Sequence, residues 1–341
     1  MKRFAFFACI LLAACGSGPE TVATGPRLHA EPAASFRDDE GPGREAAFSA
    51  DGQMLATTSA TGLVVIRHMP GLKIVRRLQH PGGATTIAFA PDGKWLATAG
   101  YDGEILLWET ATGRQVRRLE GARGTVWTLD YAPGGERLAA AGEDGKVRVW
   151  NPADGRLLLT LAGHERNIWE IGFSPDGRRL ASGSFDATVR LWDSGSGGAL
   201  AVLTDHEEAV VGLAWSPDGR LLATGGDDST IILRRASDGK AVRRIEVGNH
   251  AYKLAFSPDS RWLVNAGRAR SGLGTLWHGL TGTGADGEAV RLWRVADGAL
   301  VQSLKMPEDV MYVGFSPEGR WLTASGDDGS VTLWRLRAGT D

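Results

Sequence analysis

The sequence predicts an all-β protein in which seven small antiparallel sheets follow one another along the chain. The first observation is a short motif, typified by FSPDG, that recurs seven times in the 341 residues. Its copies start at residues 48, 89, 131, 173, 215, 256 and 315, so that every step but the last is 41 or 42 residues long. A fixed period of this size marks a repeat architecture. The second observation is that three turn signals divide each copy into four strand-length runs.

The turn signals have a clear chemical basis. In residues 174–177 (SPDG) the proline presets φ, the aspartate accepts local hydrogen bonds, and the glycine supplies a positive φ. Asp144-Gly145 and Asp154-Gly155 represent the second and third turns, and the runs between turns, such as residues 188–192 (TVRLW), have β-type composition. Four-stranded units of this period are typical of propeller blades. We therefore expect a seven-bladed β-propeller of four-stranded antiparallel blades.

The seventh blade lacks a fourth strand of its own, because only seven residues follow Trp334. Residues 33–37 (AASFR) align with the fourth strands of other repeats and place Phe36 at the register of Leu203. Residues 27–31 offer an alternative register. In either case an N-terminal strand should complete blade 7 and leave no long open edge.

Several repeats share residues that resemble the WD-repeat family over residues 28–337. Five repeats end their third strand with a tryptophan: Trp108, Trp150, Trp192, Trp293 and Trp334. In four of them an aspartate lies six residues earlier: Asp102, Asp144, Asp186 and Asp328. Gly163-His164 and Trp192-Asp193 supply the dipeptides that are typical of this family.

The resemblance implies a buried polar tetrad made of a histidine, a serine or threonine, an aspartate and the tryptophan. Two repeats match it in full: His80, Thr98, Asp102 and Trp108 in one, and His164, Ser182, Asp186 and Trp192 in the other. Buried polar groups of this kind need partners, and an indole N–H can only donate. Arg67 and Arg234 stand in place of the tryptophan in repeats 1 and 5, so we expect looser networks there.

The N-terminus has the features of a bacterial lipoprotein signal peptide over residues 1–14. Lys2 and Arg3 precede an apolar run, residues 4–14, that is too short to span a bilayer. The run ends in Leu-Ala-Ala-Cys, which resembles a lipobox and implies lipidation of Cys15. An ordinary signal peptide with an incidental cysteine is the alternative. We expect residues 15–27 to be a flexible tether and the protein to be anchored in the bacterial cell envelope, facing the periplasm. Gly16 favours the outer membrane over the inner.

Composition and motifs argue against several function classes. With 38 basic and 40 acidic residues, the formal net charge of −2 does not suggest a nucleic-acid binder. The histidines do not form a HExxH-type metal cluster. A GxGxxG pattern at residues 282–287 lies in a loop rather than between a strand and a helix, so it does not indicate a dinucleotide site. We expect neither a metal nor another cofactor, and no catalytic residue.

Candidate partner-binding residues come from two registers at one mouth of the central channel and from an insertion. The positions four residues before the motif aromatic, or just before the second-turn aspartate, include Tyr101, Trp127, Trp169, Phe185, Tyr252 and Met311. They could form an aromatic platform, a common type of binding anchor, or they could pack between blades. Residues 268–285 interrupt the sixth repeat and carry Trp277, in a loop that either contacts a partner or covers the ring.

These observations favour a non-catalytic, lipid-anchored scaffold of the cell envelope that binds a protein or peptide through one propeller face. The alternative is a propeller enzyme or small-ligand sensor that uses the central channel. This step from fold to function rests partly on analogy.

Overall fold

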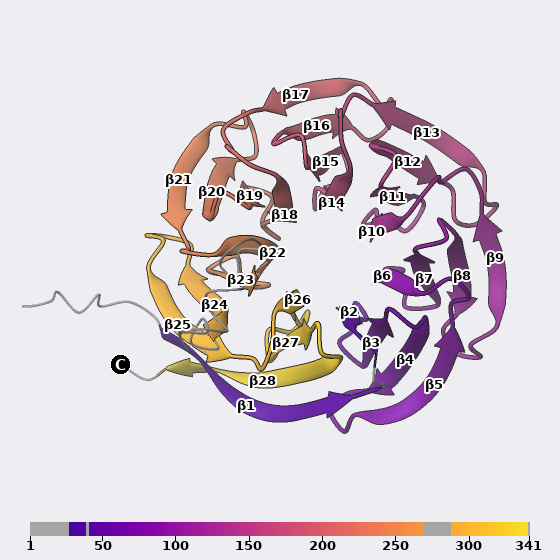
Figure 1. The fold of residues 1–341 in the computed structure, drawn as a ribbon, viewed down its shortest axis with the longest axis horizontal. Coiled ribbons are helices and arrows are strands. Elements are labelled where there is room, and N and C mark those ends of the chain that lie inside the picture. Colours follow the sequence, from indigo (N-terminus) through magenta and orange to yellow (C-terminus); the bar gives the residue numbers. More distant parts are fainter. Residues whose placement is uncertain (1–26, 39–40, 269–287, 340–341) are drawn as a thin grey trace, which may run out of the picture.

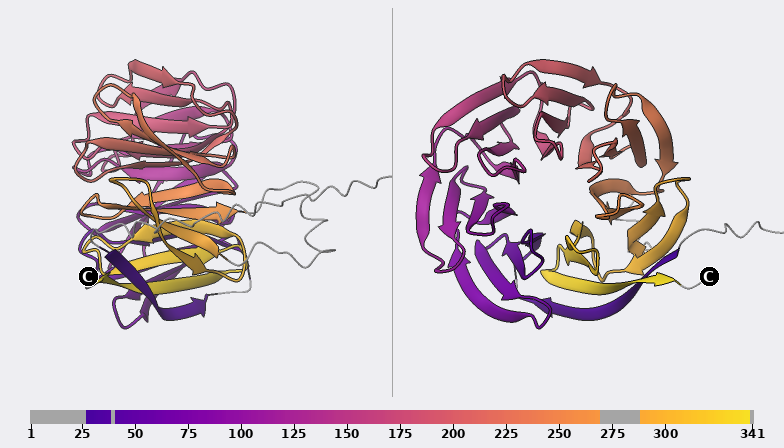
Figure 2. Two further views of the ribbon diagram at one scale, coloured as in Figure 1. Left: turned by 90° about the vertical axis from the view of Figure 1, so that its left-hand side faces the viewer. Right: turned by 180° about the vertical axis from the view of Figure 1, so that it is seen from behind.

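The computed structural model describes residues 27–38, 41–268 and 288–339. Seven four-stranded sheets surround a central axis, so the expected all-β, seven-bladed propeller is confirmed (Figure 1). In each of the first six blades the earliest strand lies nearest the axis and the latest lies on the rim (Figure 1). Figure 2 shows the ring edge-on and from behind. Among the described residues, no helix has the length and apolarity needed to cross a membrane.

The first four blades run from residue 43 to residue 203. Blade 1 comprises β2 (Gly43–Phe48), β3 (Met54–Ser59), β4 (Leu63–His68) and β5 (Lys73–Gln79). Blade 2 comprises β6 (Ala84–Phe89), β7 (Trp95–Gly100), β8 (Ile105–Glu109) and β9 (Gln115–Leu119). Blade 3 comprises β10 (Val126–Tyr131), β11 (Leu138–Gly142), β12 (Lys146–Trp150) and β13 (Leu157–Ala162). Blade 4 comprises β14 (Ile168–Phe173), β15 (Arg179–Ser184), β16 (Val189–Asp193) and β17 (Ala199–Leu203).

The last three blades complete the ring. Blade 5 comprises β18 (Val210–Trp215), β19 (Leu221–Gly226), β20 (Thr230–Arg235) and β21 (Ala241–Glu246). Blade 6 comprises β22 (His250–Phe256), β23 (Trp262–Arg268), β24 (Glu288–Arg294) and β25 (Leu300–Lys305). Blade 7 comprises β26 (Val310–Phe315), β27 (Trp321–Gly326), β28 (Ser330–Gly339) and, from the other end of the chain, β1 (Arg27–Arg37).

The repeated motif forms the hairpin between the first two strands of a blade. In blade 4 the Ser174 hydroxyl donates to the Asp176 carboxylate at 2.6 Å and accepts the Arg179 N–H at 3.0 Å. Gly177 has a φ of 68°, which an L side chain rarely adopts. The motif aromatic, Phe173, is buried at the end of the innermost strand. The motif therefore makes the turn and also supplies a core residue.

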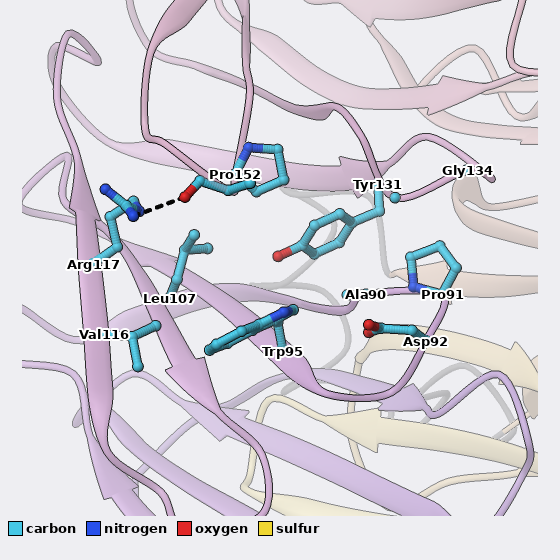
Figure 3. A pocket seen from close by; sticks show the side chains of 12 residues that line it. Ala90, Pro91, Asp92, Trp95, Leu107, Val116, Arg117, Tyr131, Gly134 and Pro152 are labelled. Carbon is cyan, nitrogen blue, oxygen red and sulfur yellow. Dashed lines mark hydrogen bonds between the residues drawn. The ribbon is translucent and has the colours of Figure 1, made fainter.

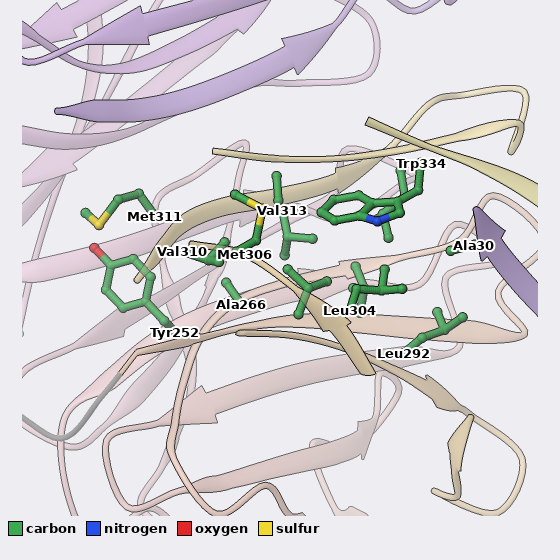
Figure 4. Close-up of a cluster of buried hydrophobic side chains, with 14 of the residues drawn as sticks. Ala30, Tyr252, Ala266, Leu292, Leu304, Met306, Val310, Met311, Val313 and Trp334 are labelled. Carbon is green, nitrogen blue, oxygen red and sulfur yellow. The ribbon is translucent and has the colours of Figure 1, made fainter. Parts of the chain in front are cut away.

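The core lies between blades. One apolar cluster joins Val149 and Leu161 of blade 3 to Ile171, Leu180 and Trp192 of blade 4. Figure 4 shows the corresponding cluster at the ring closure, where blade 6 meets blade 7 and Ala30 of β1. Each blade thus buries one face against the blade before it and the other against the blade after it, and no blade has a complete core alone.

The N-terminal strand closes the ring as expected. Phe36 pairs with Val331 in blade 7, at the same position where Leu203 pairs with Val189 in blade 4. A register shift after Pro32 lets β1 continue along β28, so residues 27–31 and 33–37 both belong to one strand. The bulge explains why the sequence offered two registers.

Most of the remaining expected segments lie outside the described residues. This holds for the signal peptide, for Cys15 and for the expected tether except Arg27, which is the first residue of β1 rather than the last of the tether. It also holds for the expected insertion at residues 268–285, with Trp277, except Arg268, which ends β23.

Deleting residues 28–37 should destabilise the whole ring by more than roughly 4 kcal/mol, because it exposes β28 and the adjoining interblade core. Thermal unfolding followed by circular dichroism is the measurement, and the expected result is one cooperative transition at lower temperature. As a control, Ser35→Ala removes only an exposed hydrogen bond to Thr332 and should change stability by at most about 0.5 kcal/mol. An unchanged melting temperature for the deletion would contradict the closure.

Candidate functional site

The two sequence-matched tetrads form continuous hydrogen-bonded chains. In blade 4 the buried His164 ring lies 2.9 Å from the Asp186 carboxylate through Nδ1 and 2.7 Å from the Ser182 hydroxyl through Nε2. Trp192 Nε1 donates to the same hydroxyl at 2.9 Å. This series of hydrogen bonds connects the loop before the innermost strand, where His164 lies, to the second and third strands of the blade. The polar groups satisfy one another, which is a structural role.

Blade 2 has the same arrangement with a longer first link. The His80 ring lies 2.9 Å from the Thr98 hydroxyl and 3.4 Å from Asp102, and Trp108 Nε1 donates to Thr98 at 2.8 Å. Burial lowers the pKa of the His80 imidazole, despite the opposing effect of Asp102. The ring is therefore neutral near pH 7 and binds its neighbours as an uncharged imidazole.

Blades 1 and 5 replace the tryptophan by arginine, and each arginine forms an ion pair with an aspartate; Nε and Nη2 of Arg234 are buried and have no hydrogen-bond partner among the described residues. The Arg234 side chain is 1% exposed and forms an ion pair with Asp205. Arg67 Nη1 donates to Asp38 at 2.8 Å, and its guanidinium lies over the Phe36 ring at 4.0 Å. A buried guanidinium needs a counter-charge. Each arginine therefore has an aspartate from the loop that precedes its blade.

Five aromatic side chains form a connected row at one mouth of the channel, on the face where the innermost strands begin. We call this the upper face and the row the aromatic ladder. Trp127 and Trp169 stack with ring centroids 4.8 Å apart, and Trp169 stacks on Phe185 at 5.3 Å. Tyr101 meets Trp127 edge-on at 5.8 Å, and Tyr252 meets Trp169 edge-on at 5.7 Å. The structure thus brings five of the candidate binding residues together.

The members of the ladder differ in exposure. Tyr252 is 5% exposed and the neighbouring Met311 is 9% exposed, so both are largely packing residues. Trp127 and Trp169 are half-buried. The indole N–H of Trp127 has no hydrogen-bond partner among the described residues. Tyr101 and Phe185 are also half-buried, so four members of the ladder are accessible to another molecule.

Four members of the ladder, all but Phe185, line a cavity of about 330 Å³ in the upper face. Arg44 and Asp327 also line it and form an ion pair at 3.1 Å, and the Arg44 guanidinium lies over the Tyr101 ring at 5.9 Å. Glu45 and Lys253 also line the cavity. The mouth therefore combines aromatic surface with charges of both signs.

A buried charged cluster occupies the pore below the mouth. Lys253 Nζ forms an ion pair with Glu170 and lies 3.5 Å from Glu45 Oε1. The Thr128 hydroxyl donates to Glu170 at 3.3 Å. Burial opposes the charge on Lys253, but the two carboxylates more than offset it and raise the pKa of the ammonium. A permanently protonated amine cannot act as a nucleophile.

Two carboxyl groups in the pore have pKa values that burial raises above the usual range. Burial raises the pKa of Glu170 to about 7, although Lys253 lowers it. Burial also raises the pKa of Asp130 to about 7, and its carboxylate accepts the Phe173 N–H at 2.7 Å. Asp130 and Glu170 come from adjacent blades, and each has a partner from a neighbouring element. Their contacts connect blades across the pore.

The pore side chains satisfy the free edges of the innermost strands. The Glu45 carboxylate accepts the Ile87 N–H of the next blade at 3.0 Å. In the same way, the Asp130 carboxylate accepts the Phe173 N–H of the next blade at 2.7 Å. Trp215 Nε1 donates to the Gly172 carbonyl of the preceding blade at 2.9 Å. Buried backbone groups need such partners. This polar cluster therefore has an architectural explanation.

The sequence analysis did not predict the pore cluster, because within the innermost strand it considered only the register four residues before the motif aromatic. The next register carries Glu45, Glu170, Lys253 and Tyr312, where other repeats have threonine or glycine. Asp130 stands one residue before the aromatic, where other repeats have alanine or glycine. The available signal was a charged residue at a position where most other repeats have a small residue. Among the residues that the structure describes, no group of three or more His, Cys, Asp or Glu side chains is arranged to hold a metal ion.

The tetrad aspartate predicts a specific loss of stability in acid. Burial alone would raise the pKa of Asp186, but hydrogen bonds from Thr188, from the Glu165 N–H and from His164 lower it to about 2. Because the folded pKa lies below the unfolded value of 3.8, the carboxylate stabilises the fold above that value. This contribution is lost as the pH falls toward the folded pKa.

Asp186→Asn should therefore be less stable than the parent at about pH 5, and the difference should shrink toward about pH 2. Urea unfolding across this pH range measures it. Asp154→Asn, in the exposed third turn of blade 3, is the control and should leave the pH profile unchanged. A constant difference at all pH values would show that the charge of Asp186 does not contribute.

Comparison with known families identifies the repeat. Residues 83–271, more than half of the chain, match the family model described as IFT122 first beta-propeller. Residues 298–335 match the model described as WD domain, G-beta repeat. WD-repeat propellers are generally non-enzymatic and commonly act as protein-interaction scaffolds. Taken with the seven four-stranded blades, these matches show that the chain belongs to the WD-repeat β-propeller family.

Proposed function

We propose that the protein is a non-catalytic scaffold that binds a protein or peptide partner through its upper face. The observation that carries the proposal is the aromatic ladder, in which Trp127 and Trp169 stack on each other and are half-buried beside a cavity. Tryptophan and tyrosine dominate the binding energy of many interfaces. The Arg44–Asp327 pair, which also lines the cavity, supplies polar groups to fix a partner's orientation.

The proposal includes a lipid anchor in the bacterial cell envelope, with the outer membrane as the expected site. Its support is the sequence of residues 1–15, with a basic start, a short apolar run and Cys15 after two alanines. The first described strand, β1, lies on the rim of blade 7 (Figure 1). Detergent-phase partitioning of the wild type, lost in Cys15→Ser, tests this anchor.

A small-ligand sensor is the second candidate function. It is favoured by one observation, that the upper cavity reaches Glu45 and Lys253 and so offers both charges to a small molecule. A thermal-shift screen with small zwitterionic compounds separates it from the scaffold, because only a sensor would be stabilised by a free small ligand.

The scaffold proposal predicts that Trp127→Ala combined with Trp169→Ala removes peptide binding. Peptides selected from a random display library against the wild type serve as probes, and isothermal titration measures their affinity. Losing two aromatic anchors should weaken binding more than about 30-fold, because each is worth at least about 1 kcal/mol. The double variant should keep the wild-type circular dichroism spectrum.

Trp95→Ala is the matched control, since this tryptophan lies at the opposite end of the strands and is also solvent-accessible. It should not alter binding of peptides that protect the upper face in hydrogen exchange. Full affinity of the double variant for such peptides would contradict the proposed binding surface.

A further inference from the structure

The loops of the upper face carry a large excess of negative charge. Adjacent strands of a blade are antiparallel, so the turn between the second and third strands and the segment that leads to the next blade both lie on this face. The described residues of these connections include 17 aspartates and glutamates, two arginines, Arg123 and Arg166, and no lysine. Nine of the acidic residues lie in the turns within blades and eight in the segments between blades. The excess is therefore spread around the whole mouth of the channel.

The lower face, where the innermost strands end, has no such excess in its described loops. Its connections, which join the first strand of a blade to the second and the third to the fourth, contain ten acidic and nine basic residues among those described. Figure 3 shows a pocket on this face, between blades 2 and 3, whose charged lining residues are Asp92 and Arg117. The Arg117 guanidinium donates to the carbonyls of Ala153 and Asp154 at 2.8 and 2.9 Å. The two faces of the ring therefore differ in charge.

Much of the negative charge on the upper face is accessible to another molecule. Some carboxylates already have partners, since Asp38 and Asp205 pair with buried arginines. Six others belong to exposed glutamates that form no ion pair with a described residue: Glu120, Glu143, Glu165, Glu207, Glu208 and Glu308. Charges of one sign on one surface repel each other and attract a partner of the opposite sign.

Two of these glutamates adjoin the segments that carry the stacked indoles of the aromatic ladder. The Glu143 carboxylate accepts the N–H of Thr125 at 2.9 Å, two residues before Trp127. Glu165 lies in the loop that enters β14, four residues before Trp169. The negative charge and the aromatic surface therefore belong to the same part of the upper face.

The cavity beside the ladder does not oppose a cation. Arg44 and Lys253 line it together with Glu45 and Asp327, so its lining carries both signs equally. Arg44 forms an ion pair with Asp327 at 3.1 Å, and Lys253 lies 3.5 Å from the Glu45 carboxylate. Both cations of the lining therefore have a carboxylate beside them, and the surrounding loops determine the sign of the charge that a partner meets.

The ladder already accommodates guanidinium groups at both ends of its row. The Arg44 guanidinium lies over the Tyr101 ring at 5.9 Å, and that of Arg166 lies over the Phe185 ring at 6.0 Å. Among the described residues, no lysine or arginine makes such a contact with the two stacked indoles between them. Tryptophan is the best aromatic partner for a cation, and the planar guanidinium of arginine stacks on aromatic rings. The indoles are therefore suited to an arginine from another molecule.

We propose that the partner of the upper face is a basic, arginine-containing segment of a protein. An arginine side chain of this segment stacks on the ladder indoles, and further basic side chains pair with the exposed glutamates around the mouth. Complementary charge of this kind favours the correct partner and speeds its association. The inference rests on the proposed function, because the ladder and its cavity are the binding surface and the charge of the loops specifies what binds there.

Titration of the full chain with three decapeptides tests the inference. The peptides share one glycine-serine background and carry arginine, glutamine or glutamate at the same four positions. We expect saturable binding of the arginine peptide, at least about tenfold tighter than binding of the glutamine peptide, and no binding of the glutamate peptide. Raising the ionic strength from about 0.05 to about 0.5 M should weaken binding of the arginine peptide, because salt screens exposed charges.

Two double variants of the upper face locate the contact. Glu143→Gln combined with Glu165→Gln should weaken binding of the arginine peptide about fivefold, as expected for the loss of two exposed ion pairs. Trp127→Ala combined with Trp169→Ala should weaken it more than about tenfold, because the stacking surface is lost. Circular dichroism and melting temperature check that both proteins are folded.

Matched controls lie on the lower face. Asp154→Asn combined with Glu318→Gln removes two exposed carboxylates, and so changes the net charge by the same amount as the upper-face glutamine variant. Trp95→Ala removes a solvent-accessible indole. Both control proteins should bind the arginine peptide with wild-type affinity.

The inference is overturned if the arginine peptide shows no saturable binding or binds no more tightly than the glutamine peptide. It is also overturned if the upper-face glutamine variant keeps wild-type affinity, or if spermine binds more tightly than the arginine peptide, because the occupant would then be a small polyamine.

Failure of this inference can be distinguished from failure of the proposed function. Neutral or acidic peptides selected from the random display library that lose affinity in the double tryptophan variant would uphold the upper face as a binding surface and exclude a basic partner. If no selected peptide depends on the two tryptophans, the proposed function itself is contradicted.

Discussion

The pairing of β1 with β28 is the contact on which the rest of the structure depends. Each blade buries both faces against its neighbours, so a ring with an open seam would expose two apolar faces and a strand edge. The two strands come from opposite ends of the chain, and their pairing closes the seam. Ala30 and Gln302 also exchange hydrogen bonds at 2.9 and 3.1 Å, which joins β1 to blade 6. The chain ends therefore stabilise two blades at once.

A closed ring creates a second constraint. One edge of every innermost strand faces the pore, and the backbone groups on that edge need hydrogen-bond partners. Glu45, Asp130 and Trp215 each bond to the backbone of an adjacent blade there, and Lys253 balances the carboxylates. Polar residues in the centre of a propeller can thus serve the architecture. The aromatic ladder, which lies on the upper face, is the surface that we propose for recognition.

Much of the fold could be predicted because turn chemistry and strand alternation are local properties. The repeat period, the hairpin at residues 174–177 and the register of Phe36 followed from such patterns. Contacts between distant positions could not be predicted in the same way. Asp38 and Asp205 lie in loops outside the repeat register, so their pairing with buried arginines was not visible. The pore cluster combines Glu45 of blade 1, Glu170 of blade 4 and Lys253 of blade 6, which meet only once the ring is closed.

Native-state hydrogen exchange of the β28 amides that face β1 tests the central claim most directly. If the pairing of β1 with β28 holds the ring together, these amides should exchange only when the whole protein unfolds. Their free energy of exchange should then equal that of the amides of β10 in blade 3. Fast exchange of β28 while β10 remains fully protected would contradict the account, because the ring would then be stable with its seam open.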